Sequence, residues 1–157
     1  MTTLLILRHG PAEAPRVGCP DAERPLSPEG RRRTQAAMKR LVGLGHRPDH
    51  IFHSPYVRAH ETALHLQAEA GGCALASHGD LTPQGCPDVV LTWIQAVVAE
   101  HPTGTVALVS HEPLVSLLLE DLCRRQDELG LAGCAVLQWN GRDWRLERVV
   151  RPADGLA

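Results

Sequence analysis

Two short apolar runs in this chain each lead directly into a histidine. Residues 4–7 (Leu-Leu-Ile-Leu) precede Arg8 and His9, and residues 106–109 (Val-Ala-Leu-Val) precede the Ser-His pair that ends at His111. A short, continuous apolar run fits a strand that is buried on both faces, as in a parallel sheet covered by helices. The pattern therefore predicts an α/β fold in which two buried strands end in polar residues.

Helical periodicities and turn signals alternate with these runs, as an α/β domain requires. Helices are expected over residues 28–44, 55–70, 88–100 and 113–124, and further strands over 49–53 and 74–77. Segments 134–139 and 144–150 flank Asn140-Gly141, a hairpin signal that predicts a mixed edge and pairs Trp139 with Trp144. We expect one domain over residues 1–157, a three-layer sandwich whose mostly parallel central sheet is flanked by helices.

A third polar segment follows the strand expected at 49–53. Ser54 and Pro55 suit the cap and first position of a helix, which places Arg58 in the first helical turn. Free N–H groups and the helix dipole favour an anion there. If the three strands are parallel neighbours, their carboxyl ends bring Arg58 to the same sheet edge as the two histidines, which is the usual place for ligands.

This set of side chains fits the chemistry of phosphoryl transfer. An imidazole can attack phosphorus and hold it as a phosphoramidate, which splits a difficult hydrolysis into two easier steps. An arginine offers a planar fork of donors that matches phosphate oxygens. The sequence therefore predicts two arginines and two histidines around one phosphoryl group.

Five motifs extend this interpretation along the chain. They are RHG at 8–10, RPLSPEG at 24–30, SPYVRAHET at 54–62, LTPQG at 81–85 and SHEPLV at 110–115. In order and spacing they resemble the histidine phosphatase superfamily from residue 3 to about residue 122, and more narrowly its small SixA-like phosphohistidine phosphatase branch. The resemblance implies a phosphoglycerate mutase-like fold and assigns roles to four residues: His9 as the phosphorylated nucleophile, Arg8 and Arg58 as phosphoryl ligands, and His111 as a donor to the transferring group.

The resemblance also implies an acidic residue in the segment before the second histidine, where Asp80 is the candidate general acid. The alternative is that Asp80 caps the turn that follows it. Glu13 and Asp21, in the long segment 11–27, are the fallback acids. Since a phosphoramidate leaves readily once its nitrogen is protonated, the lack of a glutamate at this position favours phosphohistidine over a phosphomonoester.

The length of chain between Arg58 and His111 bears on the substrate. Little chain is left there to build a lid, and an open site fits a phosphorylated side chain presented by a partner protein better than a small ligand. We therefore expect a phosphatase acting on phosphohistidine in a partner protein. A phosphatase for a small phosphomonoester or phosphoanhydride, and a phosphate-binding module without turnover, are the alternatives.

Composition limits the other possibilities. The formal charge of −2 argues against nucleic-acid binding. The histidines at 60 and 65 are five residues apart, not four as in the HExxH zinc motif, so neither a metal nor another cofactor is expected. The five cysteines form no CxxC pair, and no apolar stretch has the length of a membrane span, which favours a cytoplasmic protein without a membrane partner.

Overall fold

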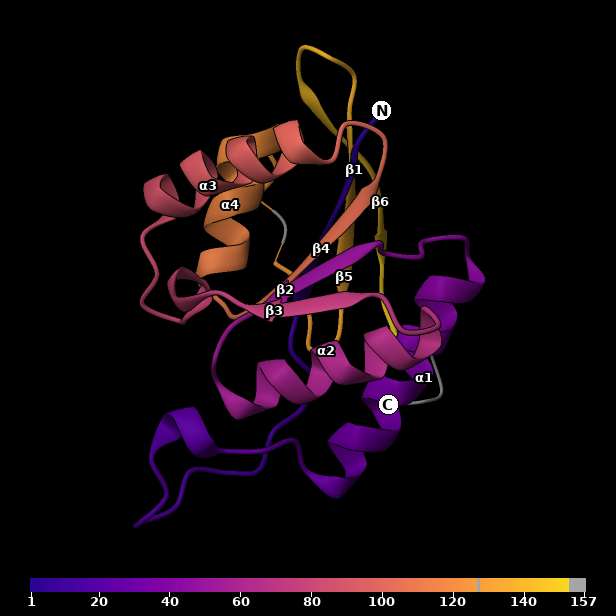
Figure 1. Cartoon of the computed structure of the whole chain (residues 1–157). Helices are drawn as coiled ribbons and strands as arrows, with labels where there is room; N and C mark the ends of the chain where they lie inside the picture. Colours follow the sequence, from indigo (N-terminus) through magenta and orange to yellow (C-terminus); the bar gives the residue numbers. More distant parts are fainter. Residues whose placement is uncertain (127, 153–157) are drawn as a thin grey trace.

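The computed structural model of the chain describes residues 1–126 and 128–152. Helices and strands alternate along it (Figure 1). In chain order they are β1 (Thr3–Arg8), η1 (Asp21–Glu23), α1 (Pro28–Gly43), β2 (His50–His53), α2 (Val57–Glu69), β3 (Ala74–Ser77), η2 (Gly79–Leu81), α3 (Pro87–Glu100), β4 (Thr105–Ser110), α4 (Leu114–Cys123), β5 (Cys134–Trp139) and β6 (Trp144–Val150), where η denotes a 3₁₀ turn.

The strands form a six-stranded sheet in the order β3-β2-β4-β1-β5-β6. The first four strands of that order run parallel, whereas β5 is antiparallel to β1 and β6 is antiparallel to β5. The mixed edge predicted from the hairpin signal is thus confirmed. Trp139 and Trp144 are register partners in this hairpin, and their ring centroids lie 5.3 Å apart.

Two apolar cores lie on opposite faces of the sheet, because successive side chains of a strand point to opposite faces. Leu4 and Ile6 of β1 belong to the core beneath α3 and α4. Leu5 and Leu7 belong to the core beneath α1 and α2. Figure 1 shows the same division, with α3 and α4 on one side of the sheet and α1 and α2 on the other. The predicted three-layer α/β sandwich is confirmed, and β1 is buried at its centre.

The helix ends follow the local capping chemistry. The side chain of Ser27 accepts a hydrogen bond from the Gly30 N–H at 2.9 Å, so α1 begins at Pro28 as predicted. The start predicted for α2 was wrong: α2 begins at Val57, and Ser54 is not its cap. Ser54 Oγ instead accepts the N–H of Tyr56 at 3.2 Å in the turn before the helix.

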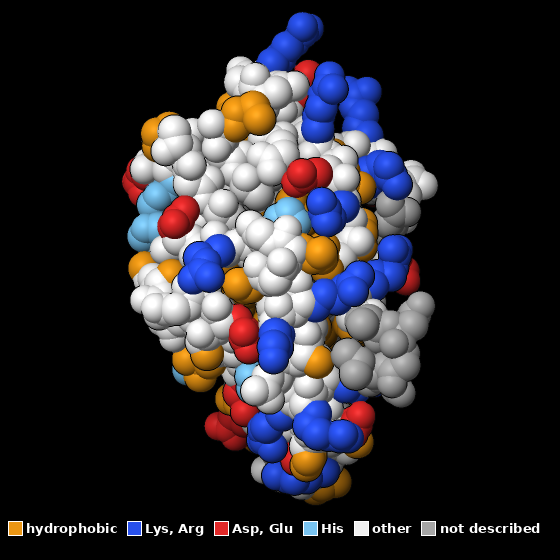
Figure 2. All heavy atoms as spheres, turned by 90° about the vertical axis from the view of Figure 1, so that its right-hand side faces the viewer, with side chains coloured by type: hydrophobic (Ala, Val, Ile, Leu, Met, Phe, Trp, Pro, Cys, Tyr) orange, Lys and Arg blue, Asp and Glu red, His pale blue; other side chains and the backbone are white. Residues whose placement is uncertain are grey.

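The surface mixes charges of both signs. On the face shown in Figure 2, basic side chains are interspersed with acidic and apolar ones. Among the helices of the described residues, none is both long enough and apolar enough to cross a membrane.

Candidate active site

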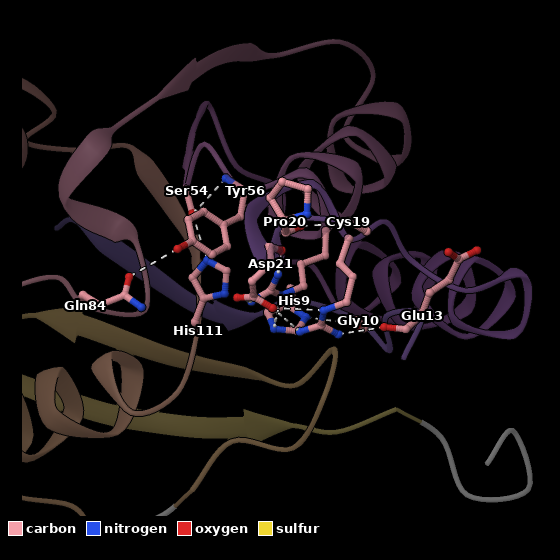
Figure 3. Close-up of polar contacts among 12 residues, drawn as sticks. His9, Gly10, Glu13, Cys19, Pro20, Asp21, Ser54, Tyr56, Gln84 and His111 are labelled. Carbon is pink, nitrogen blue, oxygen red and sulfur yellow. Dashed lines mark hydrogen bonds and ion pairs between the residues drawn. The ribbon is translucent and has the colours of Figure 1, made fainter. Parts of the chain in front are cut away.

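The carboxyl ends of β1, β2 and β4 meet at one edge of the sheet, since β4 lies between the other two strands and all three are parallel. The N–H of His9, just past β1, donates to the carbonyl of Ser110 at the end of β4, at 3.1 Å. The ring centroids of His9 and His111 are 5.0 Å apart. Arg58 in the first turn of α2 reaches the same place, so the predicted convergence of these residues is observed (Figure 3).

The ring of His9 is held at both nitrogens. Nδ1 lies 2.7 Å from the carbonyl oxygen of Gly10, and Nε2 accepts a hydrogen bond from Arg58 Nε at 3.3 Å. A carbonyl can only accept and a guanidinium can only donate, so the proton of a neutral ring sits on Nδ1 and the lone pair on Nε2. The side chain is only 8% exposed. His9 therefore presents a fixed, unprotonated nitrogen to the arginine.

A small backbone turn supports this ring. The N–H of Gly10 donates to Thr62 Oγ1 at 3.0 Å, and that hydroxyl donates to the carbonyl of Arg58 at 2.8 Å. A side chain at position 10 would overlap the Thr34 hydroxyl on α1, which explains why glycine follows the histidine. The turn after β1 is thus tied to the helix that carries Arg58.

Arg58 donates in three directions. Besides its contact with His9, Nη1 donates to the Asp21 carbonyl at 2.7 Å, and Nη2 lies 3.1 Å from the Asp21 carboxylate. The same carboxylate accepts Nε and Nη2 of Arg24 at 3.0 and 2.8 Å. Asp21 therefore bridges two arginines, and the long segment 11–27 folds over the site.

His111 is buried against the turn between β2 and α2. Its Nε2 lies 2.8 Å from Ser54 Oγ, and its ring packs edge-on against Tyr56 with centroids 5.0 Å apart. Its Nδ1 is buried and has no hydrogen-bond partner among the described residues. Figure 3 shows this ring between Ser54 on one side and Asp21 and His9 on the other. An unpaired buried nitrogen beside the nucleophile is available to a bound group.

Arg8 completes the cationic set. Its Nη1 donates to the carbonyl of Leu129 at 3.1 Å, while its Nε is buried and lacks a partner among the described residues. Buried donors that have no partner are costly, so an anion that accepted this N–H would be stabilised.

Burial and positive charge keep both histidines neutral. The pKa of His9 is lowered to about 4, chiefly by burial and also by the charges of Arg58, Arg8 and Arg24, against the opposing effect of the hydrogen bond to the Gly10 carbonyl. Burial, then His9 and Arg58, lower the pKa of His111 to about 3. The arginines also hold the pKa of Asp21 below its ordinary value, chiefly through the hydrogen bonds from Arg24. A neutral imidazole beside guanidinium groups is suited to attack an anionic phosphoryl group.

These residues enclose a hollow of about 370 Å³ at the sheet edge. It is lined by Arg8, His9, Ala12, Asp21, Arg24, Arg58, Pro83, His111, Glu112 and Leu131. Its polar lining combines three arginines and two histidines with two carboxylates. No group of three or more metal-ligating side chains occurs among the described residues.

Comparison with known proteins identifies the family of this chain. The model of the histidine phosphatase superfamily (branch 1) matches residues 4–83. The chain belongs to the histidine phosphatase superfamily. It is 31% identical over 125 residues to the phosphohistidine phosphatase SixA of Escherichia coli, which covers 76% of this chain and 73% of that protein.

One further relative and one solved structure extend the comparison. An uncharacterised protein of Picosynechococcus sp. is 34% identical over 110 residues, which is 70% of this chain and 66% of the relative, just under two thirds of its length. A structure of the protein histidine phosphatase SixA complexed with tungstate superposes with a TM-score of 0.86 at 23% identity, over 96% of this chain and 97% of that one. The last likeness concerns the fold, which is the phosphoglycerate mutase-like fold that the motifs implied.

The three candidate acids lie in different places. Asp21 lines the hollow. Asp80 lies in η2, outside the hollow, with its carboxylate 3.9 Å from Nδ1 of His78. That nitrogen accepts the backbone N–H of Asp80, so His78 caps the 3₁₀ turn. The carboxylate of Glu13 lies 3.5 Å from Arg16 on the exposed part of the long segment. The role of Asp80 as general acid remains a prediction.

Sequence reasoning did not single out two charged residues of the hollow, Glu112 and Arg24. Glu112 follows His111 immediately and its carboxylate accepts the N–H and the hydroxyl of Ser116. Arg24 opens the RPLSPEG motif and reaches the site from a loop. Both residues belong to motifs of the sequence, Glu112 to SHEPLV and Arg24 to RPLSPEG, and this was the available signal. The contact of Arg24 with Asp21 follows no periodic pattern.

Proposed function

We propose that this protein removes the phosphoryl group from a phosphohistidine side chain of a partner protein, through a covalent phosphohistidine formed on His9. The observation that carries the proposal is the fixed state of the His9 ring, whose Nδ1 faces the Gly10 carbonyl while Nε2 bears a lone pair beside Arg58. A nucleophile must be unprotonated and aligned, and here the protein supplies both conditions before substrate binds.

In the proposed first step, His9 Nε2 attacks phosphorus and the bond from phosphorus to the substrate imidazole breaks. The leaving nitrogen takes a proton from a general acid or from water, and the phosphoryl group remains on His9. Arg8 and Arg58 bind the phosphoryl oxygens, on which the negative charge lies, and His111 Nδ1 faces the transferring group. A bound anion raises the pKa of His111, because a nearby negative charge favours the protonated imidazole.

In the second step, water attacks the phosphorus of the phosphorylated His9. The phosphorus–nitrogen bond breaks, inorganic phosphate leaves and the His9 lone pair is restored. The same arginines stabilise the charge in both steps, since the phosphoryl group stays in place while the nucleophile changes. No metal ion takes part in this scheme.

Two observations favour a protein-borne substrate. Between Arg58 and His111 the chain completes α2 and forms β3, η2, α3 and β4. Of these, α3 packs on the face of the sheet opposite to α1 and α2. Of the chain between Arg58 and His111, only Pro83 lines the hollow, so this part of the chain provides little cover over the site. The similarity to SixA, whose name describes a phosphohistidine phosphatase, also favours this substrate class.

The proposal is tested by trapping the intermediate. A protein phosphorylated on histidine is mixed with the enzyme, the reaction is quenched within milliseconds in base, and the enzyme is mapped by mass spectrometry. We expect acid-labile, base-stable phosphate on His9 in the wild type and in His111→Asn, and none in His9→Asn. Phosphate on His111 would contradict the assigned nucleophile.

Turnover assays then separate the substrate classes. The kcat/KM for the phosphorylated protein is compared with that for p-nitrophenyl phosphate and a panel of small phosphomonoesters and phosphoanhydrides. A higher kcat/KM for the protein is expected. A preference for one small ester would assign the protein to the alternative class, and binding without any phosphoenzyme would indicate a module without turnover.

A further inference from the structure

The carboxylate of Asp21 occupies the arginines of the candidate site. We propose that Asp21 is a built-in competitor of the phosphoryl group: its carboxylate occupies Arg58 and Arg24 in the free protein, and a bound anion must displace it. This inference rests on the proposed function, since it assigns the displaced donors to the substrate.

The contacts of Asp21 are those that a phosphoryl group needs. Its Oδ2 lies 3.1 Å from Arg58 Nη2, and its Oδ1 lies 2.8 Å from Arg24 Nη2. Carboxylate and phosphoryl oxygens are equivalent acceptors for a guanidinium fork. Arg58 Nε points at His9 Nε2, the atom that would carry phosphorus, so the remaining donors of Arg58 lie beside that position. A group on His9 and the Asp21 carboxylate therefore compete for the same donors.

Asp21 is the partner that can move. Its side chain is 54% exposed, whereas that of Arg58 is 5% exposed. Asp21 begins η1, a single turn that contains no buried residue and has no side-chain cap. Solvent can thus hydrate the carboxylate as soon as it leaves the arginines, while Arg58 stays fixed in the first turn of α2.

Charge decides which anion displaces it. A phosphoryl group that carries two negative charges interacts more strongly with two guanidinium groups than a carboxylate with one charge, whereas a singly charged anion gains no such advantage. The competitor therefore weakens the binding of all anions, and it makes the site select for dianionic groups. In chemical terms, Asp21 is a specificity-determining residue of the anion site.

The test measures tungstate, a dianion, by isothermal titration calorimetry with the full chain. Asp21→Asn keeps the size of the side chain and removes its charge, so we expect tungstate to bind about three- to tenfold more tightly, the range set by one or two partly exposed ion pairs. Asp21→Glu, which restores the charge, should bind like the wild type. Asp143→Asn is the matched control, because Asp143 is an exposed carboxylate 4.0 Å from Arg142 on the β5–β6 hairpin.

The outcomes separate this inference from the proposed function. Equal or weaker tungstate binding by Asp21→Asn would overturn the competitor role, and so would a gain of the same size in Asp143→Asn, which would reflect net charge alone. A hundredfold loss of kcat in Asp21→Asn would assign Asp21 to proton donation instead. If Arg58→Ala, which should lose tungstate binding, bound it as tightly as the wild type, the anion site of the proposed function would itself be wrong.

Discussion

Lowering the pH should destabilise this protein through the two histidines of the candidate site. His9 has a pKa of about 4 and His111 of about 3 in the folded chain, against an ordinary value of 6.5 in the unfolded chain. Between these values the unfolded chain binds more protons than the folded one, so acid shifts the equilibrium toward unfolding. The contribution of the two neutral rings to the free energy of unfolding is therefore present above pH 6.5. It is lost as the pH falls from there toward the folded pKa values of about 4 and about 3.

The size of the effect follows from the two pKa values. Integrating the linkage relation from pH 7 to pH 5 gives a loss of about 2 kcal/mol for each ring, or about 4 kcal/mol for both, which is a large part of the stability of a small domain. Both side chains are buried, His9 at 8% and His111 at 2% exposure, so solvent screens these charges weakly. Protonation of either ring therefore requires the site to open to solvent.

Urea unfolding of the wild type and of His9→Asn at pH 7, 6 and 5 measures this loss. The wild type should lose about 2 kcal/mol more than the variant between pH 7 and pH 5, because asparagine does not titrate. The burial that lowers the pKa of His46 and His53 acts equally in both proteins and cancels in the difference. If the two proteins lost the same free energy, the site would not hold His9 in its neutral form, and the argument for a preformed nucleophile would fail.

Three further predictions concern catalysis. Since attack requires neutral His9, kcat/KM should fall on the acid side with a midpoint near pH 4, and a profile flat to pH 3 would count against a histidine nucleophile. If Asp80 is the general acid, Asp80→Asn should slow esters with poor leaving groups by about 10²–10⁴ and p-nitrophenyl phosphate much less; equal losses on both would show that Asp80 shapes the site. Activity should survive EDTA, because arginines supply the charge that a metal supplies elsewhere; loss in EDTA that a divalent ion restores would refute this.

The fold could be predicted because its signals are local and repeated. Leu4 to Leu7 form an uninterrupted apolar run, and a strand with that pattern needs helices on both faces, which is what the two cores provide. The convergence of His9 and His111 followed from the same pattern, because both residues come directly after buried strands that pair in parallel. The parallel pairing of β1 with β4 then places both histidines at the same edge of the sheet.

Other parts of the site depend on contacts that no local pattern records. The sequence around Ser54 is the same whether its side chain caps a helix or supports a turn. Only the structure places the Ser54 hydroxyl 2.8 Å from His111 Nε2. Asp21 meets Arg58 across 37 residues of sequence from a segment without periodicity. Tertiary packing decides the partners of such loop residues. The sequence therefore indicated Asp21 as a candidate acid but could not predict its contacts with Arg58 and Arg24.

The position of β4 has a consequence for how the protein is made. β4 lies between β1 and β2 in the sheet, yet it follows both in the sequence by more than fifty residues. A chain that has emerged from the ribosome only as far as α3 therefore lacks the strand that joins β1 to β2, and the backbone N–H and C=O groups that these two strands direct toward β4 remain unpaired. His111 follows β4 directly, so its contact with His9 can form only after β4 has been made. The candidate site is thus completed only after β4 has been synthesised, and chains that end before β4 should require chaperones rather than show partial activity.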